Sequence, residues 1–281
     1  MNHRIGLLAS LLPDGPSLGG VADLGLSVCQ LVCWKPAIYT QELAAHVRRA
    51  AAEKAIAITS LWAGWPGPAI WDLLDGPGTL GLAPREHRAV RVAALKQAGD
   101  FAQQAGLPAV VTHLGFIPEQ PRDPLFEEMV VAVRDVALYL QEREIEFWFE
   151  TGQETPITLL RLMRQVGTSN LGINLDPANL ILYGKASPVD ALDVFGAHVR
   201  SVHAKDAFYP TDPMRLGREV PVGEGRVRFP DLVRRLTEIG YDGAFIIERE
   251  ISGPQQEKDI RHAITYLDRL LGQNAPLGFA P

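Results

Sequence analysis

Short apolar runs alternate with longer amphipathic runs along the 281 residues of the chain. A bounded apolar run predicts a buried strand, whereas apolar residues at a helical spacing over a longer window predict a helix. The apolar runs predict eight strands, over Ile5–Ala9, Leu26–Leu31, Ala55–Leu61, Ala109–His113, Ile145–Glu150, Leu171–Asp176, Val199–His203 and Ala244–Glu248. The amphipathic runs predict seven helices, over Gln41–Glu53, Pro84–Gln104, Leu125–Arg143, Ile157–Gln165, Pro188–Phe195, Phe229–Ile239 and Gln256–Leu271.

This alternation indicates the fold class. Strands that alternate with helices at this period form a parallel sheet with crossover helices. Eight repeats favour a closed barrel over an open doubly wound sheet, and no G-x-G-x-x-G motif follows the first strand to support a dinucleotide-binding fold. The segment Pro13–Gly25 is short and rich in glycine, so the first helix is expected to be degenerate. We therefore expect one α/β domain over residues 1–281, a (β/α)8 TIM barrel.

The connection after the third strand is unusually long, from Trp62 to Ala83, and contains Trp62, Trp65 and Trp71. Loops that follow barrel strands leave from the catalytic face, and long ones tend to be functional. We interpret this loop as a lid over a substrate; the alternative is a surface loop that packs its own tryptophans. Trp34, just beyond the second strand, is expected to form part of the same pocket wall.

Composition excludes several functional classes. The formal net charge is −6, whereas nucleic-acid binders usually carry a basic face. No stretch approaches the roughly 20 apolar residues that span a bilayer, and the first apolar run is too short for a signal peptide. Cys29 and Cys33 have no matching metal-ligand pair elsewhere, so we interpret them as reduced thiols of a cytoplasmic protein. Neither nucleic acid nor membrane is an expected partner.

Side chains that can bind a metal stand where the predicted strands end. Glu150, Asp176, His203 and Glu248 end the fifth to eighth strands, and His113 ends the fourth. Barrel active sites lie at the carboxyl ends of the strands, so these side chains are expected to converge. A single glutamate at a strand end is more often solvated, and a single histidine is more often a core residue. Four successive strand ends of this kind favour a shared site.

Three carboxylates and one imidazole suit one divalent cation. Carboxylates favour the harder ions, and the histidine also admits zinc or cobalt, so Mn, Mg, Co, Zn and Fe are all candidates. Glu250 shares a strand face with Glu248 and is the main rival for the last ligand position.

Five segments carry a family resemblance: Thr112–Pro118, Phe149–Gly152, Asn174–Asn179, Val202–Asp206 and Ile246–Glu250. In this order and spacing they resemble the xylose-isomerase-like barrel superfamily of sugar (phosphate) isomerases and epimerases. The resemblance covers nearly the whole chain. The motifs are specific for the superfamily and not for a substrate.

The resemblance implies a ligand set of Glu150, Asp176, His203 and Glu248, with Glu150 and Glu248 also transferring the proton. A metal that holds a carbonyl and a neighbouring hydroxyl oxygen acidifies the α-carbon proton and stabilises an enediolate. Carboxylates on opposite sides of that carbon can remove and return the proton. Epimerisation needs both faces of the carbon, whereas aldose–ketose isomerisation can use one.

The substrate is expected to be a small sugar or polyol. The resemblance gives Arg218 as a substrate-binding arginine; the alternative is an exposed loop arginine. His113 is a candidate ligand of a substrate hydroxyl, and Lys205 follows the His203 ligand closely enough to act beside it. Trp34 and Trp62 complete the expected substrate-binding set. A homo-oligomer is left open.

Two departures from related enzymes restrict the function. Abasic-site endonucleases of the superfamily have a histidine three residues after the aspartate ligand, where this chain has Asn179, and an Asp-x-His pair where this chain has Leu216–Glu219. A trinuclear zinc cluster would lack ligands, so DNA repair is not expected. The remaining alternatives are an inosose-type dehydratase and a non-catalytic sugar-binding barrel. The intact four-ligand set argues against the second.

Overall fold

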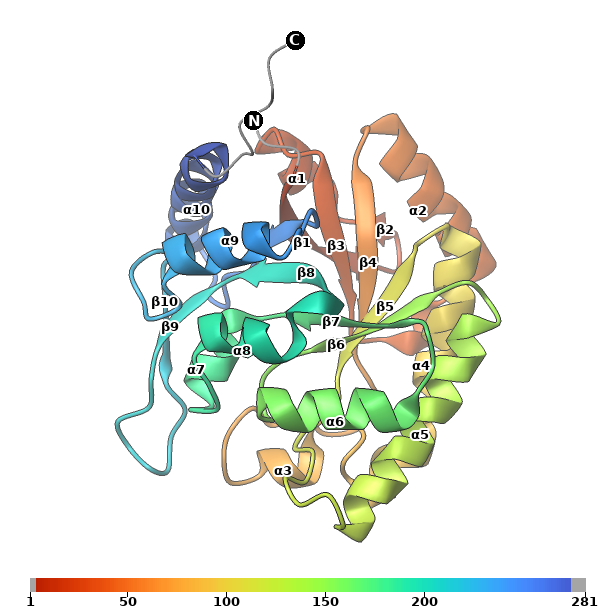
Figure 1. Ribbon diagram of the computed structural model, residues 1–281. Coiled ribbons are helices and arrows are strands. Elements are labelled where there is room, and N and C mark those ends of the chain that lie inside the picture. Colours follow the sequence, from red (N-terminus) through yellow and green to blue (C-terminus); the bar gives the residue numbers. More distant parts are fainter. Residues whose placement is uncertain (1–3, 274–281) are drawn as a thin grey trace.

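The computed structural model describes residues 4–273, which form a closed barrel of eight parallel strands surrounded by helices (Figure 1). The last strand pairs with the first, through Ile5 beside Phe245, and this pairing closes the ring. The predicted (β/α)8 TIM barrel is therefore confirmed. In ring order the strands are β1 (Ile5–Leu12), β3 (Val28–Cys33), β4 (Ala57–Ala63), β5 (Ala109–His113), β6 (Glu146–Glu150), β7 (Leu171–Leu175), β8 (Val199–Ala204) and β11 (Phe245–Ile247).

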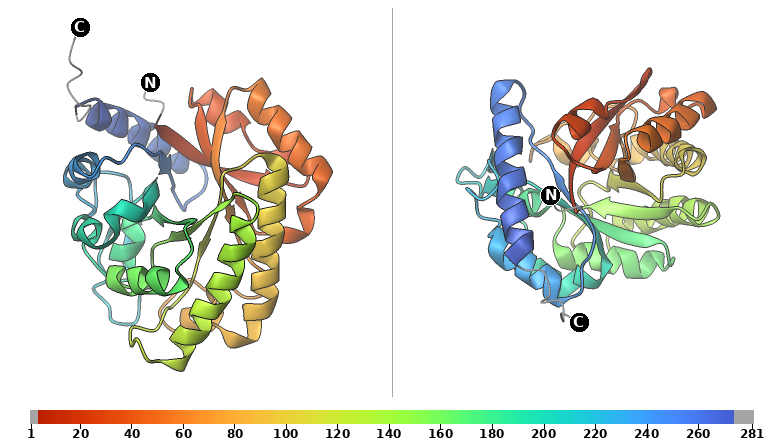
Figure 2. Two further views of the ribbon diagram at one scale, coloured as in Figure 1. Left: turned by 45° about the vertical axis from the view of Figure 1, so that its right-hand side comes forward. Right: turned by 90° about the horizontal axis from the view of Figure 1, so that it is seen from above.

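Helices cover the outside of the ring on all sides (Figure 2). The long ones are α2 (Gln41–Glu53), α4 (Arg85–Ala105), α5 (Pro124–Gln141), α6 (Pro156–Val166), α8 (Pro188–Phe195), α9 (Phe229–Glu238) and α10 (Pro254–Gln273). The one helix between the described strands β1 and β3 is α1 (Gly19–Asp23), five residues long, which confirms the degenerate first helix. Within residues 4–273, none of the helices has the length and apolarity needed to cross a membrane.

Successive residues of a strand point to opposite faces of the barrel wall. One set therefore packs beneath the helices, and the other fills the barrel interior. Val110, Phe149 and Ile173 pack in the large cluster beneath the helices, whereas Val111 and Trp148 belong to a smaller interior cluster. Burying one such side chain contributes roughly 1.5–3 kcal/mol. The same alternation leaves polar residues at the interior ends of the strands, where the site forms.

Several short elements were not predicted. β2 (Gly15–Pro16) folds back on β1, and β9 (Asp206–Phe208) pairs with β10 (Arg218–Val220) as an antiparallel ribbon. Asp206 accepts hydrogen bonds from the backbone amides of Gly223, Gly225 and Val227, so this buried carboxylate fixes the loop after β10. The other short helices are η1 (Pro36–Ile38), α3 (Gly76–Thr79), α7 (Pro177–Leu182) and η2 (Gly196–His198).

Three predicted boundaries at the site were wrong. β4 runs to Ala63, so Trp62 belongs to a strand and not to the long loop. β7 ends at Leu175, and Asp176 is the N-cap of α7, because Pro177 favours the first position of a helix. β11 ends at Ile247, one residue before Glu248.

The long loop after β4 is fastened to the barrel. The buried guanidinium of Arg91 donates to the carbonyls of Pro66, Pro68 and Gly81. Gly81 has a φ of +65°, and a Cβ there would lie 2.1 Å from the Leu114 carbonyl carbon, so only glycine allows this close approach. The base of the loop is therefore held in place by the Arg91 side chain and by the close backbone approach at Gly81.

Candidate active site

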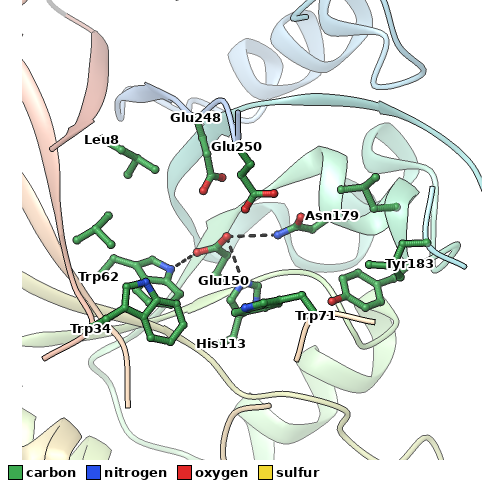
Figure 3. A pocket seen from close by; sticks show the side chains of 13 residues that line it. Leu8, Trp34, Trp62, Trp71, His113, Glu150, Asn179, Tyr183, Glu248 and Glu250 are labelled. Carbon is green, nitrogen blue, oxygen red and sulfur yellow. Dashed lines mark hydrogen bonds and ion pairs between the residues drawn. The ribbon is translucent and has the colours of Figure 1, made fainter. Parts of the chain in front are cut away.

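A pocket opens at the carboxyl ends of the strands, where the predicted site residues gather. Its volume is about 440 Å³. Glu150 lies at its centre, Glu248 and Glu250 approach from one side, and Trp34 and Trp62 lie on another (Figure 3). This is the catalytic face of a TIM barrel.

Four predicted ligands converge beneath this pocket. Glu150, Asp176, His203 and Glu248 each offer one atom, and these atoms all lie within 4.8 Å of one another. The register of neighbouring strands brings these residues together. Glu150 pairs with Asn174, two residues before Asp176, and His203 pairs with Ile246, two residues before Glu248. Glu150, Asp176 and His203 are buried, and the Glu248 side chain is 14% exposed.

Asp176 has two different roles for its two carboxylate oxygens. Oδ1 accepts a hydrogen bond of 2.8 Å from the backbone amide of Asn179 and so caps α7. Oδ2 is buried, has no hydrogen-bond partner among the described residues and lies 3.9 Å from His203 Nδ1. Because this hydrogen bond fixes Oδ1, it orients Oδ2 toward the ligand atoms of Glu150, His203 and Glu248.

His203 is oriented by residues on neighbouring strands. Its Nε2 lies 2.7 Å from Gln30 Oε1 and 3.0 Å from Asn174 Nδ2. Gln30 is itself held by a 2.8 Å hydrogen bond from its Nε2 to Ser60 Oγ. When Nε2–H donates to Gln30, the other nitrogen, Nδ1, is left to bind a cation. Nδ1 lies 3.0 Å from Glu248 Oε2.

Glu150 is fastened by donors from three other elements. His113 Nε2 lies 3.2 Å from Glu150 Oε1, and Asn179 Nδ2 donates to the same oxygen over 3.3 Å. The indole N–H of Trp62 donates to Oε2. Asn179, which stands where the endonucleases have a histidine ligand, therefore acts here as a hydrogen-bond donor.

The buried ammonium of Lys205 joins both candidate last ligands. Its Nζ lies 3.1 Å from Glu250 Oε1 and 3.5 Å from Glu248 Oε2. The Glu250 side chain is 58% exposed and lines the pocket, whereas Glu248 belongs to the four-ligand group. Of the two rivals, the geometry brings Glu248 to the cluster.

The pKa values reflect a strongly negative buried cluster. Burial raises the pKa of Glu248, but Lys205 and His203 outweigh it and lower the pKa to about 2. Burial also opposes ionisation of Glu150, yet His113 and His203 hold its pKa well below the usual range. Burial lowers the pKa of His203, but Glu150 and Glu248 outweigh this effect and raise the pKa well above its ordinary value. When His203 carries a proton, its positive charge offsets part of the negative charge of Glu150 and Glu248.

The donor set fits one divalent cation. His203 Nδ1 and Asp176 Oδ2 are buried and have no hydrogen-bond partner among the described residues, and their charged neighbours are Glu248 Oε2, 3.0 Å from Nδ1, and Lys205 Nζ, 3.5 Å from Oδ2. Both point into the group of converging ligand atoms. An ion at that point would satisfy them, and three carboxylates with one imidazole are suitable ligands for Mg, Mn, Co or Zn.

The predicted substrate-binding residues fall into two groups. His113, Trp34 and Trp62 line the pocket, and Lys205 lies directly behind it. Arg218 does not line the pocket; it is exposed on β10, with its guanidinium 5.2 Å from the centre of the Phe208 ring. Of the loop tryptophans, Trp71 lines the pocket, whereas the buried Trp65 does not.

Sequence reasoning missed Gln30, Gln153 and Tyr183. Gln30 is a fully buried amide within the apolar strand β3, and a polar residue in such a run is a signal of an interior hydrogen bond. Tyr183 lines the pocket after α7, and Gln153 is buried three residues after Glu150. Nothing in the spacing of these two residues pointed to the pocket.

Comparison with known proteins agrees with this architecture. A xylose isomerase domain protein from Planctomyces limnophilus is 36% identical to this chain, with a TM-score of 0.91 over 97% of this chain and 98% of that one. A D-tagatose 3-epimerase-like protein is 20% identical with a TM-score of 0.71, over 96% of this chain and 100% of that one, a likeness of fold alone.

The uncharacterized protein MJ1311 from Methanocaldococcus jannaschii is 27% identical over 188 residues, which make up 63% of this chain and 60% of that protein. The match thus spans less than two thirds of this relative. Residues 19–270 match the family model described as xylose isomerase-like TIM barrel. The chain therefore belongs to the xylose isomerase-like TIM barrel family.

Proposed function

We propose that this chain is a divalent-metal-dependent sugar isomerase or epimerase. The observation that carries the proposal is the convergence of Glu150, Asp176, His203 and Glu248 within 4.8 Å beneath an open pocket. A non-catalytic sugar-binding barrel has no need to gather three carboxylates and an imidazole at one point. The fold by itself does not decide the activity.

The four convergent residues would hold the cation. When bound, it would polarise a substrate carbonyl and so acidify the adjacent C–H bond. Glu150 and Glu248 both line the pocket, and the pKa of each is lowered, so both are ionised at neutral pH and able to accept a proton. One carboxylate removes the α-proton, and the other first takes up a proton from solvent and then supplies it to the opposite face of the same carbon.

Other residues would position the two bases and the substrate. The Trp62 indole N–H and the Asn179 amide hold the Glu150 carboxylate, which limits its rotation. Lys205 holds Glu248 from behind. His113 reaches the pocket beside Glu150 and is available for a substrate hydroxyl.

The test is a screen of ketoses, aldoses and inososes with the full chain, in added Mn, Mg or Co and in excess chelator. The proposal expects an epimer or isomer of at least one sugar, and loss of that product on chelation. Glu248→Gln should abolish the product. The matched change Glu127→Gln, on the outer helix α5, should not. Dehydration of an inosose without any sugar isomer would instead favour the dehydratase.

A further inference from the structure

The charge on the pocket wall restricts which substrates can enter. Glu150, Glu248 and Glu250 line the pocket, and among the described residues neither lysine nor arginine lines it. Lys205 lies behind the wall, where Asp176, Glu248 and Glu250 already surround its ammonium group. Even with a divalent cation bound, these carboxylates leave the site without net positive charge.

Two other cations, which do not line the pocket, contact aromatic rings. Arg218 is exposed on β10 and stacks on Phe208. Lys185 Nζ lies 6.0 Å from the centre of the Phe116 ring, which itself makes an edge-on contact with Tyr183. Neither forms the bidentate or clustered cationic contact by which proteins bind phosphate.

One wall of the pocket is aromatic. Trp34 and Trp62 have ring centres 4.8 Å apart, and Trp71 lies 4.9 Å from His113. Trp34 and Trp71 keep 42% and 38% of their surface exposed (Figure 3). Rigid, partly exposed rings of this kind suit the C–H face of a sugar or polyol.

The side toward α7 offers uncharged polar groups. The Tyr183 hydroxyl and both polar atoms of the Gln153 side chain are buried without hydrogen-bond partners among residues 4–273. Tyr183 lines the pocket, and Gln153 lies close enough to influence its hydroxyl. The carboxyl oxygens of Glu154 are also buried and have no hydrogen-bond partner in the part of the chain that the structure describes. The phenol of Tyr183 and the amide of Gln153 can hydrogen-bond to the hydroxyl groups of a substrate, whereas the nearby carboxyl group of Glu154 disfavours the binding of an anion.

We infer that the substrate is an uncharged sugar or polyol, which packs on Trp34 and Trp71 and hydrogen-bonds to Tyr183, and that phosphorylated sugars are excluded. This inference rests on the proposed function and narrows its substrate class. It selects the unphosphorylated members from the sugars and sugar phosphates that the family resemblance allows.

The test compares matched pairs on the magnesium-loaded full chain: D-fructose with D-fructose 6-phosphate, and D-glucose with D-glucose 6-phosphate. Binding is followed by calorimetry, independently of turnover. The uncharged member of a pair should bind at least about tenfold more tightly than its phosphate ester, since buried like charges disfavour the ester. A phosphate ester that binds as tightly as its parent sugar, or more tightly, would overturn the inference.

Two variants make the test specific. Glu250→Gln removes one lining carboxylate and should narrow the gap between sugar and ester, whereas Glu127→Gln on α5 should leave it unchanged. Tyr183→Phe should weaken binding of the uncharged sugar about fivefold to tenfold, the effect of one lost hydrogen bond. Equal affinities in Tyr183→Phe and the parent chain would contradict the assigned role of Tyr183.

The inference and the proposed function can fail separately. Selective binding of uncharged sugars without any isomer formed would leave the inference standing and remove the proposed activity. Isomerisation of a phosphate ester would support the proposed activity and overturn the inference that the substrate is uncharged.

Discussion

The imidazole of His203 on β8 lies against the side-chain amide of Gln30 on β3, with 2.7 Å between His203 Nε2 and Gln30 Oε1. Three steps around the ring separate the two strands, so the contact crosses the barrel interior. It fixes which ring nitrogen faces the carboxylates. A residue of an apolar strand, far from the candidate ligands in sequence, thereby orients the histidine of the candidate metal site.

Gln30→Leu should weaken binding of a divalent ion by about 10–100-fold, the usual effect of losing the group that orients a histidine ligand. Gln30→Glu keeps an acceptor for Nε2–H and should retain most of the affinity. Calorimetric titration with Mn or Mg measures both. Unchanged affinity in Gln30→Leu would mean that Gln30 only packs in the interior.

Metal affinity should fall as the pH is lowered, because His203 must lose its proton before Nδ1 can bind a cation. The neighbouring carboxylates raise the pKa of His203 above its ordinary value, so this competition extends above the usual imidazole range. Glu248, with a pKa of about 2, stays ionised throughout. Titrations between about pH 6 and about pH 9 should show affinity rising with pH, by at most about tenfold per unit for one released proton. A flat profile would contradict a His203 ligand.

Arg91 should be essential to the loop that follows β4. Arg91→Leu leaves the buried carbonyl of Gly81 and the carbonyl of Pro68 without their hydrogen bonds to the guanidinium, and we expect a loss of about 3 kcal/mol in the free energy of unfolding. The exposed Arg85, which pairs with Glu128, provides the control, and Arg85→Leu should cost less than about 1 kcal/mol. Chemical denaturation compares them. Equal losses in the two variants would show that the loop does not depend on Arg91.

Tryptophan fluorescence should report sugar binding through Trp71 and not through Trp65. Trp71 lines the pocket, whereas Trp65 is buried beside Arg91, with 5.2 Å from the guanidinium to its ring. A saturating ketose should change the emission of the parent chain and of Trp65→Phe. Trp71→Phe should lose much of that change. The opposite ranking of the two variants would remove Trp71 from the substrate-binding wall.

The sequence was sufficient to predict the barrel and to expect the four candidate ligands at one place. Strand alternation is a local pattern, and the carboxyl ends of parallel strands meet at one face, so Glu150, His203 and Glu248 could be expected together. Asp176 was assigned to the end of a strand, although the pair Asp176-Pro177 is a typical helix start. The orientation of Asp176 Oδ2 depends on this N-cap, and the assignment of Asp176 to a strand did not predict it.

What could not be predicted depends on contacts between distant segments. Trp62 extends β4 because its partner strand β3 runs to Cys33, where Cys33 pairs with Ala63. The family resemblance predicted Arg218 near the substrate, but the antiparallel pairing of β10 with β9 leaves it outside the pocket. Its role in substrate binding stays a prediction. Tyr183, which lines the pocket, and Gln153 beside it could be recognised only after the walls of the pocket were known.

The central claim is that Glu150 and Glu248 move a proton at a carbon next to a carbonyl. The most direct measurement is solvent deuterium incorporation, followed by NMR, into a panel of ketoses incubated with the magnesium- or manganese-loaded chain. We predict exchange of the α-proton in at least one ketose, loss of epimer formation in both Glu150→Gln and Glu248→Gln, and retained turnover in Glu250→Gln. Epimer formation that persists at full rate in Glu248→Gln, or exchange that persists at full rate in excess chelator, would contradict this mechanism.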